Sequence, residues 1–128
     1  MELVRLSQWN LFLHSSDKNK AINIVKQFLK QNEKIKPTSE IEYSDYRKLE
    51  GVKVSFTCHH TAPSWTELVY DLILTTQISA RELILTGSIK ESIDIFSNNV
   101  YGAKGGIRAL GMVCSRLDYS VETDVCNQ

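Results

Sequence analysis

The sequence has few of the residues that hold small proteins together through covalent or metal links. It contains three cysteines, Cys58, Cys114 and Cys126, which are well separated along the chain. An odd number of distant cysteines argues against a disulfide framework and offers no Cys-x-x-Cys metal motif. Cys58 and Cys114 lie in strand-like runs, so we expect reduced thiols packed as small core residues, whereas Cys126 lies in a polar tail.

Long apolar runs are also missing. No stretch approaches the roughly 18 apolar residues of a membrane span, and residues 1–10 lack the apolar centre of a secretory signal. We therefore expect a soluble, cytoplasmic protein with no membrane partner. The 128 residues contain no Pro- or Gly-rich linker, which predicts a single domain over residues 1–128 that buries a core without metals or disulfides.

The chain carries no net charge, because 15 Lys and Arg residues balance 15 Asp and Glu residues. It therefore has no overall field that would favour nucleic acid or an anionic membrane. The charge is unevenly spread, however. Residues 18–36 hold six lysines and one acid, whereas residues 65–94 hold five acids and two basic residues. A partner attracted by charge must therefore bind to a local charged patch.

What the sequence does contain is a strand, helix and strand pattern written twice. In each copy, apolar residues recur at i, i+3, i+4, i+7 and i+8, which is typical of a helix with one buried face. These positions are Ala21, Ile24, Val25, Phe28 and Leu29 in the first copy and Trp65, Leu68, Val69, Leu72 and Ile73 in the second. Two such helices predict a single sheet covered on one side, with its other face free.

Capping residues and alternation place the elements along the chain. Asp17 precedes a helix that runs to about Asn32, and Ser64 with Glu67 forms a capping box for the second helix. Alternating apolar residues, glycines and turn residues predict strands over residues 9–14, 40–49, 52–58, 83–85 and 107–116. Residues 89–103 mix helical spacing with loop residues, and the polar tail from Asp118 either frays or adds a short edge strand.

This order predicts an α+β domain, in which two helices lie on one face of an antiparallel sheet. The arrangement is a ferredoxin-like β-α-β-β-α-β order with an extra C-terminal hairpin segment. An alternative within the same class joins the last two strands as a long hairpin at one edge of the sheet.

Signals for catalysis are weak. Residues 86–88 lack the Gly-x-Ser-x-Gly elbow of a nucleophilic serine, and a strand rather than a helix follows the glycines of residues 102–106. His59 and His60 precede Pro63 at what we predict to be a loop, with no second histidine at metal-ligand spacing. We expect no cofactor, no metal and no enzymatic activity. A small metal- or ligand-binding enzyme using His59 and His60 is the alternative.

Two clusters of acidic and polar residues suit protein binding instead. Carboxylates steer a cationic partner, and tyrosine offers a large contact area with a polar tip. The predicted partner-binding residues are Glu40, Glu42, Tyr43, Asp45 and Tyr46 in one strand and Glu91, Asp94 and Asn98 before the last strand. They can equally form the solvated face of a hairpin. RNA binding is a further alternative, although the predicted strands offer few aromatic residues for stacking.

Three segments of the C-terminal third resemble small bacterial immunity proteins. The segments are residues 85–89 (Leu-Thr-Gly-Ser-Ile), 93–98 (Ile-Asp-Ile-Phe-Ser-Asn) and the glycine-flanked 106–110 (Gly-Ile-Arg-Ala-Leu). Immunity proteins of this kind accompany polymorphic or contact-dependent growth inhibition toxins. The resemblance implies a cytoplasmic antidote that binds a cognate toxin domain, often a nuclease, and blocks its active site or substrate approach without catalysing a reaction.

Overall fold

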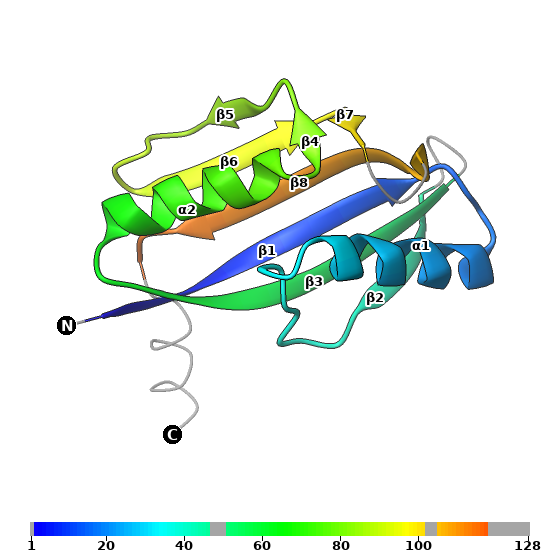
Figure 1. The fold of residues 1–128 in the computed structure, drawn as a ribbon, viewed down its shortest axis with the longest axis horizontal. Helices are drawn as coiled ribbons and strands as arrows, with labels where there is room; N and C mark the ends of the chain where they lie inside the picture. The colour runs from blue at the N-terminus through cyan, green and yellow to red at the C-terminus, as the bar shows by residue number, and fades with distance from the viewer. Residues whose placement is uncertain (1, 47–50, 102–104, 118–128) are drawn as a thin grey trace.

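Ten elements follow one another in the computed structural model, which describes residues 2–46, 51–101 and 105–117. The helices are α1 (Lys18–Gln31) and α2 (Trp65–Gln77). The strands are β1 (Leu3–Leu13), β2 (Glu42–Tyr46), β3 (Gly51–Ala62), β4 (Ala80–Arg81), β5 (Ile84–Thr86), β6 (Ser92–Ser97), β7 (Asn99–Val100) and β8 (Ile107–Ser115). Six strands form one antiparallel sheet in the order β2-β3-β1-β8-β6-β5, and β4 pairs with β7 apart from it (Figure 1).

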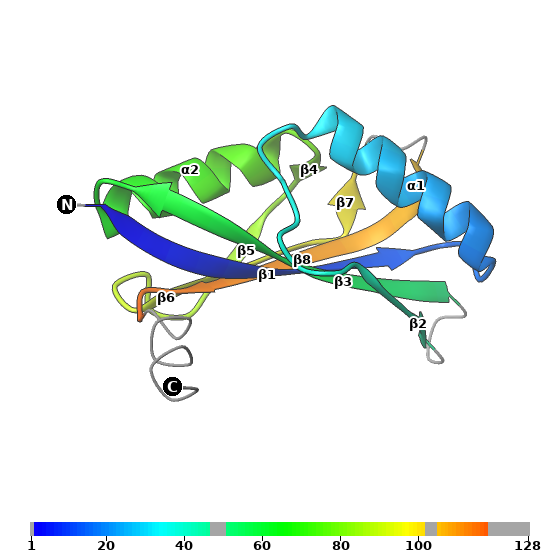
Figure 2. The same cartoon turned by 90° about the horizontal axis from the view of Figure 1, so that it is seen from below.

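Both helices lie on the same face of the six-stranded sheet, and β4 and β7 rise on that side too (Figure 2). No described helix covers the opposite face, which we call the open face. The α+β class with an antiparallel sheet and two helices is confirmed. Its two layers follow from the sequence, because each helix has a single apolar stripe to bury.

Side-chain caps fix where both helices begin. The Asp17 carboxylate accepts hydrogen bonds from the backbone N–H groups of Asn19 and Lys20, at 2.8 and 3.4 Å. The Ser64 hydroxyl accepts from the Glu67 N–H at 3.2 Å, as the capping box predicts. α2 continues past Ile73 to Gln77, and its first residue, Trp65, donates its indole N–H to the Ile89 carbonyl at 2.6 Å.

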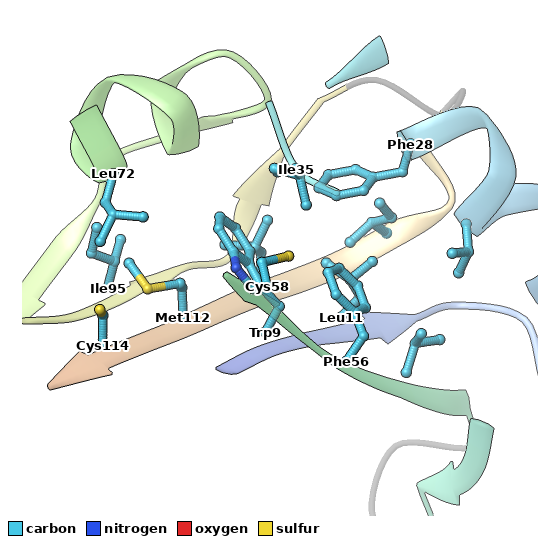
Figure 3. Packing of buried hydrophobic residues seen from close by; sticks show 14 of the residues in the cluster. Trp9, Leu11, Phe28, Ile35, Phe56, Cys58, Leu72, Ile95, Met112 and Cys114 are labelled. Atoms are coloured by element: carbon cyan, nitrogen blue, oxygen red, sulfur yellow. The ribbon is translucent and has the colours of Figure 1, made fainter. Parts of the chain in front are cut away.

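The core lies between the helices and the sheet. Alternate residues of β1 and β3 point toward the helices, and most of them are fully or almost fully buried, including Trp9, Leu11 and Phe56 (Figure 3). The Trp9 and Phe56 rings stack with centroids 6.4 Å apart and planes within 7°. Each large apolar side chain buried here stabilises the fold by about 1.5–3 kcal/mol relative to an exposed one. The predicted alternation over residues 52–58 is thereby confirmed.

The structure is richer in strands than the predicted order. β1 begins at Leu3 rather than at residue 9, because residues 3–8 pair with 57–62 along the second half of β3. The same pairing makes the prediction of a loop at His59 and His60 wrong, since both residues lie within β3. Residues 89–103 supply β6 and β7. The structure therefore has eight strands, more than the predicted ferredoxin-like order with one extra hairpin segment.

The structure confirms the core positions predicted for two of the cysteines. Cys58 and Cys114 are buried free thiols. Burial raises the pKa of each thiol to about 11, because the apolar surroundings disfavour the thiolate. Cys126 lies outside the described residues. Since the thiolate is the reactive form, both core thiols are inert at neutral pH while the protein is folded.

This predicts how the thiols react with a disulfide reagent such as Ellman's reagent at pH 8. In a Cys126→Ser variant, we expect no reaction in native buffer and two thiols after unfolding in guanidinium, because Cys58 and Cys114 are then exposed and their pKa values return toward 9. The unfolded sample is the control for reagent activity. Rapid modification of the folded variant would contradict the burial of these residues.

Candidate partner-binding surface

The open face presents the alternate residues that do not enter the core. Strand pairing aligns one row of them across the sheet, where Glu42 lies opposite Ser55, Ser55 opposite Asn10, Asn10 opposite Gly111, and Gly111 opposite Phe96. This row begins on the edge strand β2 and reaches β6. The open face is therefore a continuous surface built from five adjacent strands.

The β6 end of this row is apolar. Phe96 is 39% exposed, and Val113 on the neighbouring strand β8 is 43% exposed. Gly111 lies directly opposite Phe96, and a Cβ atom at this glycine would lie 4.0 Å from the ring atom Cδ1. Because Gly111 has no Cβ atom, it has no side chain that could cover the Phe96 ring from β8. Phe96 is thus an aromatic side chain held on a rigid strand and open to solvent.

The β2 end of the open face is acidic and hollowed. A cavity of about 220 Å³ is lined by both Glu40 and Glu42, and we call it the acidic hollow. Its other lining residues are Gln8, Ser39, Ser55, Phe56 and Thr57. Ser39 is fixed because its hydroxyl accepts the Thr57 N–H at 2.8 Å. Two exposed carboxylates in a small polar cavity can accept hydrogen bonds from the side chain of a lysine or arginine.

Two more predicted residues lie on or next to β6. Asp94 lies on β6, two residues before Phe96 and on the same side of the sheet. Glu91 precedes β6 and lines a cavity of about 310 Å³ with Arg116. Four strand spacings separate β2 from β6, so Glu42 on β2 and Asp94 on β6 lie roughly 19 Å apart across the sheet.

The structure does not bring the other predicted residues to this surface. Tyr43 and Asp45 point to the helix side of β2, where Tyr43 packs against the core and burial raises the pKa of its phenol. Asn98 is exposed beyond β6 and lies next to β7. Tyr46 belongs to β2, but its side chain lies outside the described residues. Alternation along a strand separates Glu42 from Tyr43, so acids and aromatics do not share one face.

The two adjacent histidines face opposite sides of the sheet. His59 is exposed on the open face, whereas His60 is half-buried on the helix side. There the Trp9 indole N–H donates to the Ser7 hydroxyl oxygen at 2.7 Å, and Ser7 Oγ lies 2.5 Å from His60 Nε2. Because the indole donates, the Ser7 hydroxyl keeps its own hydrogen and can donate it to Nε2 of a neutral His60.

This hydrogen-bonded chain is structural and not a nucleophilic site. Ser7 is 0% exposed, so no substrate can reach its hydroxyl. The pKa of His60 is lowered, chiefly because burial disfavours the imidazolium; the Asp71 carboxylate opposes this effect and His59 adds to it. Asp71 is itself paired with Lys34 at 3.2 Å. In the part of the chain that the structure describes, no three His, Cys, Asp or Glu side chains converge on a common point.

The predicted charge asymmetry divides the two sides of the molecule only in part. α1 carries Lys18, Lys20, Lys26 and Lys30 and contains no acidic residue. It lies on the helix side of the sheet with α2, which carries Glu67 and Asp71, whereas Glu42 and Asp94 belong to the open face (Figure 2). A cationic partner is therefore attracted to the open face and repelled by α1.

Comparison with known proteins adds no relative. No protein-family model matches the chain, and no curated protein is significantly similar to it. Neither of the two described helices is long and apolar enough to cross a membrane.

We expect the Trp9, Ser7 and His60 chain to make stability pH-dependent. The pKa of His60 is lowered from 6.5 in the folded protein, so the unfolded chain takes up a proton first as the pH falls. The free energy of unfolding should therefore decrease below pH 6.5 and be fully retained above it. Chemical denaturation at several pH values between about 5 and 8, the range in which histidine titrates, measures the free energy of unfolding.

Two single variants isolate the contribution of His60. In His60→Gln, the amide oxygen still accepts from Ser7 but does not titrate, so the decrease below pH 6.5 should become smaller. His59→Gln alters the neighbouring, exposed histidine on the open face and should keep most of the wild-type decrease, because burial, the chief cause of the lowered His60 pKa, is unchanged. An unchanged pH profile in His60→Gln would contradict a lowered pKa at this site.

Proposed function

We propose that this protein is a cytoplasmic immunity protein, which binds a cognate bacterial toxin domain stoichiometrically through its open face. The observation that carries the proposal is the acidic hollow, in which Glu40 and Glu42 converge on a sheet face that no described helix covers. The resemblance of residues 85–110 to immunity proteins supports the same function. In this proposal the protein acts by occupying a surface, so it needs neither catalysis nor a cofactor.

The dimensions of the open face suit a protein partner. A standard interface buries about 800 Å² on each partner, which is a patch roughly 30 Å across. The acidic hollow and Asp94, roughly 19 Å apart, fit within one such patch. The exposed ring of Phe96 lies beside Asp94 on β6, and the exposed Val113 lies opposite Asp94 on β8. An aromatic anchor within a polar surround is the usual composition of an interface centre.

The charges of the open face favour a cationic partner. Glu40, Glu42 and Asp94 are exposed there, whereas Lys53 is half-buried, with its ammonium 6.0 Å from the centre of the Phe12 ring. A domain that binds or cleaves nucleic acid carries clustered lysines and arginines for the phosphates. We therefore propose that the toxin domain is a nuclease and that the inhibitor covers its nucleic-acid-binding surface.

The fold fits this use. We propose that β1, α1, β2, β3, α2 and β8 form a ferredoxin-like unit and that β6 and β5 extend its sheet beyond β8. The antiparallel neighbours β2, β3, β1 and β8 support this description. The extension widens the open face by two strands and adds Asp94 and Phe96 to it.

RNA binding is a second candidate because of α1. Its four lysines, with no acid among Lys18–Gln31, form a basic surface on the helix side of the molecule. This function would use the side of the protein opposite to the acidic hollow. Binding of RNA would weaken steeply with added salt, since it depends on release of counterions from phosphates.

A tagged pull-down from the native organism, read by mass spectrometry, tests the main proposal. We expect one partner in equimolar amount: the C-terminal domain of a large secreted protein encoded by a neighbouring gene. The partner should stay bound at salt concentrations that release nucleic acid, because the interface includes buried apolar contacts as well as charges. An empty pull-down from a lysate shown to contain that toxin domain would refute the proposal.

Charge reversal on β2 tests whether the open face makes the contact. Glu42→Lys should lower the association rate constant by roughly tenfold at low salt, because it replaces an attractive charge in the acidic hollow with a repulsive one. Asp45→Lys is the matched control, since it reverses an acid on the same strand that points to the helix side. Biolayer interferometry against the immobilised toxin domain measures both. Equal effects of the two variants would exclude the open face as the docking surface.

A further inference from the structure

A cavity on the helix side of the molecule lies away from the open face. It has a volume of about 450 Å³, within the range of roughly 300–1,000 Å³ that is usual for small-molecule sites. Residues of α2, β4 and β5 line it together with Tyr101, which follows β7. We call it the charged cavity, and its lining residues are Ile73, Gln77, Ala80, Arg81, Glu82, Leu83, Leu85 and Tyr101.

The charged cavity holds one basic and one acidic side chain that do not neutralise each other. Arg81 and Glu82 are neighbours in the chain, yet no ion pair joins them, and no other described residue supplies a counter-charge to either. The Arg81 guanidinium lies 4.8 Å from the centre of the Tyr101 ring. The Asn99 amide donates to one oxygen of the Glu82 carboxylate at 3.2 Å. Each charge is therefore held by an uncharged partner, and both can still bind a charged ligand.

The backbone at Glu82 is strained. Among the described residues, Glu82 is the one non-glycine residue with a positive φ, at 52°. This left-handed conformation is unfavourable for a residue with a Cβ atom, and residues held in it cluster at ligand-binding sites. In an extended strand, successive side chains point to opposite faces, so Arg81 and Glu82 would diverge. The left-handed backbone interrupts this alternation, and both residues line the same cavity.

The residues around these charges are fixed before any ligand binds. β4 pairs with β7, and the Ser97 hydroxyl donates to the Arg81 carbonyl at 2.5 Å. The Tyr101 hydroxyl donates to the Gln77 carbonyl at 2.7 Å, and the Tyr101 N–H donates to the Ser79 carbonyl at 2.8 Å. The ring that contacts the guanidinium is thus anchored to the end of α2 and to the turn after it. A site of this kind loses little conformational entropy on binding.

The remaining wall of the charged cavity is aliphatic. Ile73 and Leu83 are half-buried and pack against the core, whereas Leu85 is 38% exposed. An apolar group placed beside these three residues would remove more of their surface from water. The cavity therefore offers a cation, an anion and an aliphatic surface to one ligand.

We infer that the charged cavity binds a free α-amino acid with an aliphatic side chain. The ligand carboxylate accepts hydrogen bonds from Arg81, the ligand ammonium group donates to Glu82, and the ligand side chain packs on Leu85. A simple anion or cation would match one of the two charges and leave the other unpaired. A zwitterion matches both, and a free α-amino acid carries both charges on one carbon atom, next to its side chain.

An NMR titration of the isotope-labelled full chain with L-leucine tests this inference. We expect saturable shifts of the amide signals of residues 80–85, with a dissociation constant in the millimolar range or lower, and no shifts over residues 42–46 on the opposite edge of the sheet. N-acetyl-L-leucine has no ammonium group and L-leucinamide has no carboxylate. Each should bind about tenfold more weakly, because it leaves one charge of the cavity without its hydrogen bond. No shifts with leucine, or an analogue that binds as tightly as leucine, would overturn the inference.

Two variants assign the contacts one by one. Arg81→Gln should weaken leucine binding by roughly tenfold and leave leucinamide binding unchanged, since leucinamide has no carboxylate for Arg81 to bind. Glu82→Gln should weaken leucine binding to a similar extent and leave N-acetyl-leucine binding unchanged. Glu33→Gln is the matched control, because it neutralises an exposed acid outside the cavity and should bind leucine as the wild type does. A variant that weakens leucine and both analogues equally would show that its charge makes no specific contact, which would also overturn the inference.

The amino-acid site is independent of the proposed function. The charged cavity lies on the helix side of the molecule, whereas the acidic hollow lies on the open face. A protein that captures its toxin domain and does not bind leucine would refute the amino-acid site alone. A protein that binds leucine and captures no toxin domain would refute the inhibitor alone.

Discussion

The long pairing of β1 with β3 is the interaction on which the rest of the structure depends. Its register runs without interruption from Leu3 opposite Ala62 to Phe12 opposite Lys53. β1 lies inside the sheet, with β3 on one side and β8 on the other, so it fixes the positions of both. Since side chains alternate along a strand, this one register decides which residues of three strands enter the core and which reach solvent.

The alternation gives the two faces of the sheet separate tasks. Trp9 and Leu11 of β1 hold the helices in place, while Gln8 and Asn10, which alternate with them, belong to the open face. The open face is therefore rigid without being part of the core. A rigid surface loses little conformational entropy on binding, which suits the binding of a toxin domain that we propose.

Local signals in the sequence were sufficient for the helices and the central strands. Ser64 and Glu67 cap α2 through a contact three residues apart, and the alternation of Val52, Val54 and Phe56 is complete within its own strand. Both features are short-range, so they can be recognised in one sequence. Residues 92–97 were harder, because their apolar residues suit a helix or a strand until pairing with β8 decides between them.

The candidate site depended on long-range pairing and was only partly predictable. Glu40 and Glu42 were identified from their charge, but their convergence with Gln8 on one hollow follows from the register of β1, β3 and β2. No sequence signal linked Ser7 to His60, since 53 residues separate them along the chain. Likewise, the separation of Glu42 from Tyr43 onto opposite faces depends on which face the helices cover.

The one-sided cover of the sheet has an evolutionary consequence. Substitutions at open-face positions such as Gln8, Thr57 or Asp94 change no contact of the buried cluster formed by Trp9 and its neighbours. Such positions can drift while the free energy of unfolding stays nearly constant. The chemistry of the open face can therefore change through successive substitutions while the buried cluster that holds the scaffold together is preserved.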